Sequence, residues 1–182
     1  MSTMLQRATI EDLYQVEGKA EIINGEMVHF MATGLRPNRA SNRIWRSLDD
    51  YEQIHGGGYA VSDNAGFKVD LPRRESFSPD AAWYTGRDTG MSFLEGAPAF
   101  AVEVRSEFDY GSAAEREMSA KRRDYFAAGT LVVWDVDLLG EDVVRVYRAD
   151  EPDAPAIYRR GDIAEAEPAV PGWRMNVNEL FR

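Results

Sequence analysis

Two acidic residues, Glu103 and Asp80, lie in or next to predicted strands, at positions where a carboxylate could bind a cation. Glu103 lies inside the apolar run Phe100-Ala101-Val102-Glu103-Val104, which predicts a largely buried strand. A buried carboxylate without a partner is costly, so Glu103 either pairs with a cationic side chain or binds a hard cation such as Mg²⁺ or Mn²⁺. Asp80 follows Pro79 at the start of another predicted strand. An Asp at that position also serves simply as a turn former.

A lysine on the next predicted helix could complete a site with these acids. Helical spacing i, i+4, i+7, i+11 and i+14 defines the stripe expected to face the sheet, and it contains Ala114, Met118, Lys121, Tyr125 and Ala128. The Lys121 ammonium either reaches water past the edge of the helix or points at Glu103, whose strand leads into this helix. Two carboxylates on neighbouring strands are the smallest unit that holds a divalent cation.

The other polar residues carry weaker signals. Arg122, Arg123 and Asp124 lie largely off the apolar stripe, so we expect them on a solvated face. His29 and His55 are isolated and show no metal-ligand spacing. Neither histidine is therefore a candidate for catalysis.

Elements that must position these residues follow from periodicity and turn signals. Thr9 and Asp12 resemble a capping box, and Asn24-Gly25 is a strong hairpin signal. Gly129 fits a helix C-cap. The predicted helices cover residues 10–16, 37–54 and 111–128, and the predicted strands cover 20–23, 26–30, 65–71, 79–84, 99–105, 131–136, 143–147 and 156–159. We expect a polar turn over 72–78, a further turn at Pro171-Gly172 and a terminal segment over 177–181.

Together these elements predict an α/β (α+β) fold with a mixed central sheet. The segment from residue 99 to residue 136 is a strand-helix-strand unit, which places its two strands in one sheet. At 182 residues the chain fits one domain, residues 1–182. The composition, 44% hydrophobic and 29% charged, is that of an ordinary globular protein.

Charge and composition exclude several classes of protein. The formal net charge is −10, so contact with nucleic acid must be local and weak. With no cysteine the chain has no disulfide, thiolate zinc site or Cys nucleophile. The sequence shows neither a signal-peptide pattern nor a long apolar run, which predicts a cytoplasmic protein without a membrane partner.

The ordered motifs resemble a known family. These motifs are Ser78-Pro79-Asp80, Val102-Glu103-Val104-Arg105-Ser106, and Lys121 with Tyr125, Gly129 and Trp134. They are similar to the Uma-type restriction endonucleases, a bacterial branch of the PD-(D/E)XK nuclease superfamily. The resemblance extends over nearly the whole chain, through Glu21-Ile22-Ile23-Asn24-Gly25-Glu26, Asn64-Ala65-Gly66-Phe67, Pro171-Gly172-Trp173 and Glu179-Leu180-Phe181.

This resemblance implies a restriction-endonuclease-like core with an N-terminal β-hairpin, and a metal-dependent endonuclease that hydrolyses phosphodiester bonds of DNA. It implies that Asp80, Glu103 and the backbone carbonyl of Val104 bind Mg²⁺ or Mn²⁺. The superfamily signature has its lysine two residues after the Glu, where this chain has Arg105. In the branch that this chain resembles, the lysine comes from the following helix, as Lys121 does. The accessory candidates are Glu21, Arg105 and Tyr125.

Two other interpretations remain open at this point. A catalytically inactive nuclease fold could serve as a binding or scaffold protein, and the charge of −10 favours that alternative. A metal-dependent hydrolase of another phosphate ester is the third possibility. Because the superfamily often needs two sites to cut a duplex, we also expect a homodimer.

Overall fold

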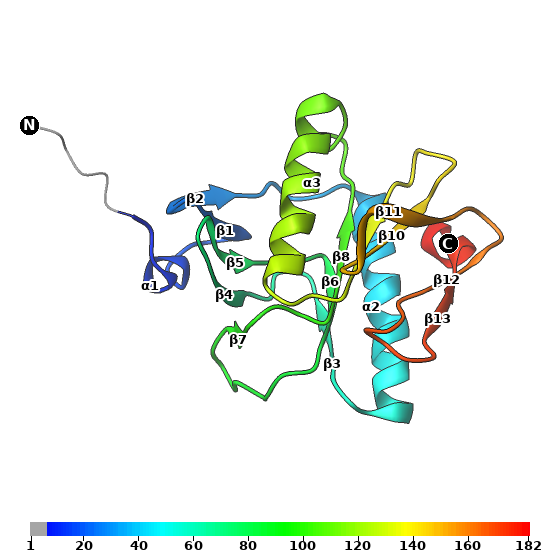
Figure 1. Ribbon diagram of the computed structural model, residues 1–182, viewed down its shortest axis with the longest axis horizontal. Helices are drawn as coiled ribbons and strands as arrows, with labels where there is room; N and C mark the ends of the chain where they lie inside the picture. The colour runs from blue at the N-terminus through cyan, green and yellow to red at the C-terminus, as the bar shows by residue number, and fades with distance from the viewer. Residues whose placement is uncertain (1–6) are drawn as a thin grey trace, which may run out of the picture.

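The computed structural model describes residues 7–182 (Figure 1). Its helical segments are α1 (Ile10–Leu13), α2 (Leu35–His55), α3 (Ser112–Ala127) and the 3₁₀ helix η1 (Val177–Phe181). The capping box predicted for α1 is confirmed, because Thr9 and Asp12 each bond the other's backbone N–H. Gly129 follows α3 with φ of 104°, as expected for a C-cap glycine.

A six-stranded mixed sheet forms the centre of the molecule. The strand order is β11-β10-β9-β8-β6-β3, and β8 and β9 are parallel whereas the other neighbours are antiparallel. The predicted strand-helix-strand unit is therefore confirmed as β8-α3-β9. The strands are β3 (Tyr59–Ser62), β6 (Ala81–Tyr84), β8 (Phe100–Val104), β9 (Val132–Val136), β10 (Val144–Arg148) and β11 (Glu151–Tyr158).

A second sheet of five strands lies beside the first and contains the predicted N-terminal hairpin. Its order is β2-β1-β5-β4-β7, with β1 (Ala20–Ile23), β2 (Glu26–His29), β4 (Phe67–Leu71), β5 (Arg74–Phe77) and β7 (Leu94–Glu95). The hairpin turn has positive φ at Asn24 (54°) and Gly25 (76°), as its two-residue connection requires. The strands β12 (Ile163–Glu165) and β13 (Arg174–Asn176) form a small third sheet.

The polar turn predicted over residues 72–78 is wrong, because residues 74–77 form β5. Only Pro72 and Arg73 make the turn. The Arg74 side chain is buried and is paired with Glu21 and Asp124, so a charge that suggested a loop is neutralised inside the fold. The strands β3, β7, β12 and β13 were not predicted, and β11 is longer than expected.

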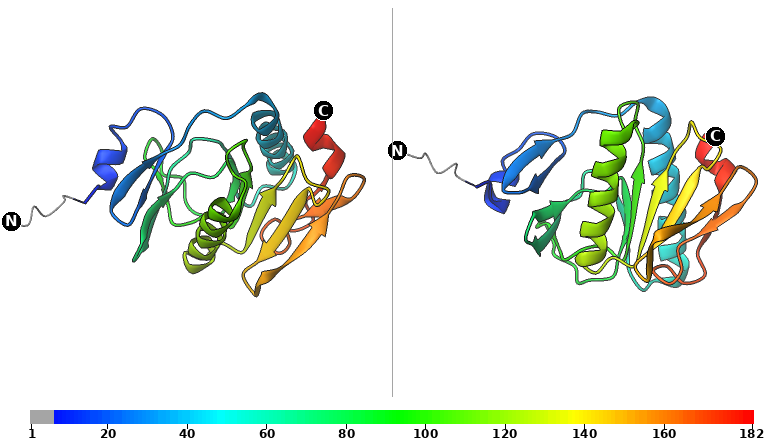
Figure 2. Two further views of the ribbon diagram at one scale, coloured as in Figure 1. Left: turned by 90° about the horizontal axis from the view of Figure 1, so that it is seen from above. Right: turned by 45° about the horizontal axis from the view of Figure 1, so that its top comes forward.

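The helices α2 and α3 cover opposite faces of the central sheet, as Figures 1 and 2 show. Side chains alternate along β8: Phe100, Val102 and Val104 pack in the core cluster that includes α2. Ala101 belongs to the cluster that includes Tyr125 of α3. Because alternate side chains point to opposite faces, Glu103 lies on the α3 face.

The solvated face predicted for residues 122–124 is wrong in part. Asp124 is buried and bonded to Arg73 and Arg74, at 3.1 and 2.9 Å. The Arg122 guanidinium lies 4.0 Å from the centre of the Tyr147 ring and contacts Asp135 at 3.4 Å. Arg123 is exposed, as expected.

Within residues 7–182, no helix is both long enough and apolar enough to cross a membrane.

Candidate active site

Asp80 is held against the end of β8 by two hydrogen bonds. Its backbone N–H donates to the carbonyl of Val102 at 2.9 Å, so it extends the pairing of β6 with β8. Its carboxylate Oδ2 accepts the backbone N–H of Val104 at 2.7 Å. These contacts fix the Asp80 side chain beside the strand that carries Glu103.

Lys121 reaches from α3 to the β8 strand and to the N-terminal hairpin. Its Nζ lies 2.8 Å from Glu103 Oε1 and 2.9 Å from Glu21 Oε1. The Tyr125 hydroxyl, one helical turn further on, donates to Glu103 Oε1 at 2.7 Å. The structure therefore brings Glu103 and Lys121 together with both Glu21 and Tyr125.

Lys19 is a charged residue of this site that the sequence did not reveal. Its Nζ lies 2.6 Å from Asp80 Oδ1 and 2.7 Å from Asp63 Oδ1. A lysine at the beginning of a hairpin strand is ordinary, so its residue type and position do not indicate a functional site. The available signal was its spacing: Lys19 and Glu21 are two residues apart on an extended segment and so point to the same face.

Glu21 connects the site to the second sheet. It is fully buried on β1 and pairs with the buried Arg74 of β5. Its Oε1 also accepts the backbone N–H of Ser78 at 2.9 Å. Since Arg74 pairs in turn with Asp124 of α3, one chain of ion pairs joins the hairpin, β5 and α3.

Burial and neighbouring charges shift the pKa values of Glu103 and Glu21 in opposite directions. Burial raises the pKa of Glu103, and the nearby charges of Asp80 and Glu21 raise it further against the opposing effect of Lys121 and Lys19. For Glu21, burial also favours the neutral form, but the charges of Lys121 and Arg74 outweigh it and lower its pKa. The effect of the Asp80 charge on the pKa of Glu103 also indicates that the two carboxylates lie within electrostatic reach of each other.

Both lysines of the site remain cations at neutral pH. Burial alone would lower the pKa of Lys121, but the charges of Glu103 and Glu21 outweigh it and raise that pKa above its ordinary value. Lys19 behaves in the same way, because Asp80 and Glu103 raise its pKa against burial. Neither ammonium is poised to give up its proton.

The Arg105 guanidinium is engaged in ion pairs with two acidic side chains outside this cluster. Its guanidinium makes two bonds to Asp135, at 2.8 and 2.7 Å, and also pairs with Glu115 of α3. These contacts join β8, β9 and the beginning of α3. Its accessory role in a reaction stays a prediction, and a structural role is what the contacts support.

The donor atoms suit a hard divalent cation, although they are few. Within residues 7–182, no group of three or more His, Cys, Asp or Glu side chains is arranged to hold a metal. Asp80 and Glu103 supply carboxylate oxygens. The N–H and C=O of one strand residue point to the same side, so the Val104 carbonyl lies on the side of β8 where Asp80 accepts the Val104 N–H. Two carboxylates and one carbonyl are oxygen ligands that Mg²⁺ and Mn²⁺ accept.

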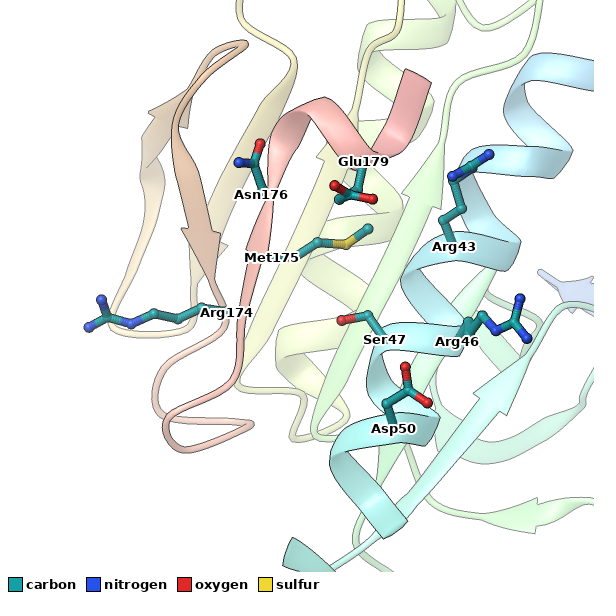
Figure 3. A pocket seen from close by; sticks show the side chains of 8 residues that line it. All are labelled: Arg43, Arg46, Ser47, Asp50, Arg174, Met175, Asn176 and Glu179. Carbon is teal, nitrogen blue, oxygen red and sulfur yellow. The ribbon is translucent and has the colours of Figure 1, made fainter. Parts of the chain in front are cut away.

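The surface hollow shown in Figure 3 is separate from this cluster. It lies between α2 and the C-terminal segment β13-η1. Its lining residues are Arg43, Arg46, Ser47, Asp50, Arg174, Met175, Asn176 and Glu179. None of these residues contacts the acid and lysine cluster, so the hollow is not part of the candidate active site.

The chain thus places a mixed sheet between two helices, with acids on neighbouring strands and a lysine on the helix that covers them. A crystal structure from Anabaena variabilis, described as a putative nuclease belonging to DUF820, superposes with a TM-score of 0.74 at 14% identity, over 96% of this chain and 97% of that one. At that identity the likeness shows the fold. The family described as "Putative restriction endonuclease" (Uma2) matches residues 8–178, and the chain belongs to this family. None of the curated proteins matches it.

Proposed function

We propose that this protein is a metal-dependent endonuclease that hydrolyses phosphodiester bonds of DNA. The observation that carries the proposal is the meeting of Asp80, Glu103, Lys121 and Lys19 where β6 begins and β8 ends in the central sheet. Membership of the restriction endonuclease family and the nuclease fold support the reaction class. The choice of metal and of DNA rests on the chemistry of the site.

The two carboxylates and the Val104 carbonyl would hold Mg²⁺ or Mn²⁺. When bound, such a metal polarises the phosphodiester and lowers the pKa of a coordinated water. Asp80 is oriented for this task by the Val104 N–H, and Glu103 by the Tyr125 hydroxyl. Both carboxylates are therefore positioned before any cation arrives.

Lys121 acts in this proposal as a fixed positive charge. Because its pKa is raised by Glu103 and Glu21, it stays protonated and cannot serve as a general base. It can donate hydrogen bonds to the attacking water or to a phosphate oxygen, and so offset the negative charge that develops in the transition state. Glu21 holds Lys121 from the opposite side.

The test measures cleavage of plasmid DNA with Mg²⁺ or Mn²⁺ by the wild type and by the Asp80→Ala and Lys121→Ala variants. Loss of one group that stabilises transition-state charge typically lowers the rate about 10² to 10³-fold, and we expect at least that for each variant. Lys68→Ala is the matched control, because Lys68 is a half-exposed lysine whose nearest carboxylate is 3.9 Å away. Undiminished cleavage by both active-site variants would reject the proposal.

An inactive scaffold is the second candidate function. The ion pairs Lys19–Asp80 and Lys121–Glu103 satisfy both carboxylates without a metal, and the charge of −10 disfavours DNA. Titration calorimetry with Mn²⁺ distinguishes the two, since a scaffold held by these ion pairs would release no binding heat. A hydrolase of other phosphate esters would cleave a small phosphodiester and leave DNA intact.

We also propose that two copies act together on a duplex. A single site of this kind cuts one strand at a time, and a symmetric dimer presents a second site to the other strand. The measurement is the solution mass, which we expect to be twice the chain mass of 20.5 kDa.

A further inference from the structure

The N-terminal half of α2 carries a stripe of arginines in an otherwise acidic protein. Arg36, Arg39, Arg43 and Arg46 follow one another at intervals of three, four and three residues, and residues 35–48 contain no acid. Residues three or four apart share one face of a helix. At 1.5 Å per residue the stripe is about 15 Å long. The buried residues of this helix, Ala40, Ser41, Ile44 and Leu48, occupy a different face.

Three of these four arginines are free to bind an anion. Within the part of the chain that the structure describes, Arg36, Arg43 and Arg46 form no ion pair with a carboxylate. Arg39 donates to the backbone carbonyl of Arg182, at 2.9 and 3.3 Å. In Figure 3, Arg43 and Arg46 extend from the same side of α2, away from β13 and η1.

The order of charges along α2 is the reverse of what helix stability favours. Acids are favoured near a helix N-terminus and cations near its C-terminus. This helix has no acid in its first turn. It has three arginines in its first half and a fourth just past its middle, whereas Asp49, Asp50 and Glu52 follow toward its C-terminus. The arginines and the positive end of the helix dipole therefore reinforce each other, which concentrates positive potential at one end of the helix.

The beginning of α2 follows, within a few residues, a segment that contacts the candidate active site. Phe30 is six residues before Arg36, and its ring centre lies 5.5 Å from Lys121 Nζ. From the end of β2 the chain passes behind α3, in the view of Figure 1, to the beginning of α2. Figure 2 shows β8 pointing toward the edge of the sheet at which α2 begins.

We infer that the arginine stripe Arg36-Arg39-Arg43-Arg46 is a contact surface for the phosphate backbone of duplex DNA that extends from the active site. This inference rests on the proposed function and adds the surface that holds the substrate. The stripe gives a protein of net charge −10 a local cationic track. Guanidinium groups suit it, because each can make two parallel hydrogen bonds to one phosphate.

The experiment measures binding of a short labelled duplex DNA by fluorescence anisotropy, in a chelator and over a series of salt concentrations. The test variant is R36Q/R43Q/R46Q, and the matched control is R87Q/R116Q/R123Q, which removes three other exposed arginines. We expect the test variant to bind at least about tenfold more weakly at physiological salt. Its slope of log affinity against log salt should fall by about 0.9 for each lost phosphate contact.

Three results would overturn the inference: no DNA binding by the wild type, equal loss in both triple variants, or competition by polyglutamate as effective as by unlabelled DNA. If the triple variant fails to fold, Arg43→Gln alone is measured against Arg87→Gln. The proposed function fails separately, if the wild type binds DNA in the chelator but does not cut it with Mg²⁺ or Mn²⁺.

Discussion

Each of the two carboxylates proposed to bind the metal is paired with a lysine. Asp80 pairs with Lys19 and Glu103 pairs with Lys121, at 2.6 and 2.8 Å. Ammonium groups at these distances neutralise the repulsion between two acids that lie close together. A metal that binds both carboxylates must therefore compete with a lysine that already belongs to the protein.

Removal of Lys19 should tighten metal binding. In the Lys19→Met variant the Asp80 carboxylate loses a competing charged partner, and such bonds typically contribute about 1.5 to 3 kcal/mol. We expect Mn²⁺ to bind about tenfold more tightly than to the wild type, as measured by titration calorimetry. Lys68→Met serves as the control, and unchanged or weaker binding by Lys19→Met would show that Lys19 assists the metal instead.

Sequence patterns identified some members of this site and missed others for physical reasons. Glu103 was detectable because a charge inside an apolar run must find a partner, and Lys121 because it interrupts an apolar helical stripe. Lys19 lies outside such patterns, and only the folded hairpin places it against Asp80. The sequence predicts Arg74 in a polar turn, because the two acids that pair with it in the fold, Glu21 and Asp124, are far from it in the sequence.

At the scale of elements, β5 joins the hairpin to α3. Arg74 of this strand is buried between Glu21 of β1 and Asp124 of α3. The predicted elements were correct where a local signal was strong, as for α3, the β1-β2 hairpin and β9. The prediction was wrong for β5, whose conformation depends on pairing with strands that are distant in the sequence. It did not include short strands such as β7 and β12.

Removal of the Asp124 charge should lower the stability of the protein. The Asp124→Asn substitution leaves Arg73 and the buried Arg74 without a full counter-charge. Breaking a buried ion pair by removing one partner costs about 3 to 5 kcal/mol, and since Arg74 keeps Glu21 we expect about 3 kcal/mol less free energy of unfolding. Urea denaturation measures it, with the exposed Asp88→Asn as control. A loss no greater than in the control would mean that Arg74 does not depend on Asp124.

At the scale of the whole molecule, stability should depend on pH through Glu21. Its pKa is lowered in the fold from the ordinary 4.5, mainly by Lys121 and Arg74 against burial. A lowered carboxyl pKa contributes stability above the unfolded-state pKa, and this contribution is lost as the pH falls through the folded-state pKa. Glu21→Gln should therefore be less stable than the wild type at pH 7, and the difference should shrink below about pH 4.5.

The measurement is the free energy of unfolding in urea at pH values from 7 to 3 for both proteins. Glu26→Gln, an exposed acid on the same hairpin, is the control. If the difference in the free energy of unfolding between wild type and Glu21→Gln stays constant across this range, the lowered pKa of Glu21 is contradicted.

The ion pairs of this site join segments that are synthesised at very different times. Lys19 and Glu21 leave the ribosome early, whereas Lys121 and Asp124 follow only after the five-stranded sheet and half of the central sheet have been made. A chain that ends before α3 consequently lacks part of the cluster, and the N-terminal hairpin has no counter-charges for Glu21 until β5 and α3 have docked. Docking of the hairpin is thus coupled to the formation of α3, which is the last element along the chain to supply a charge to the site.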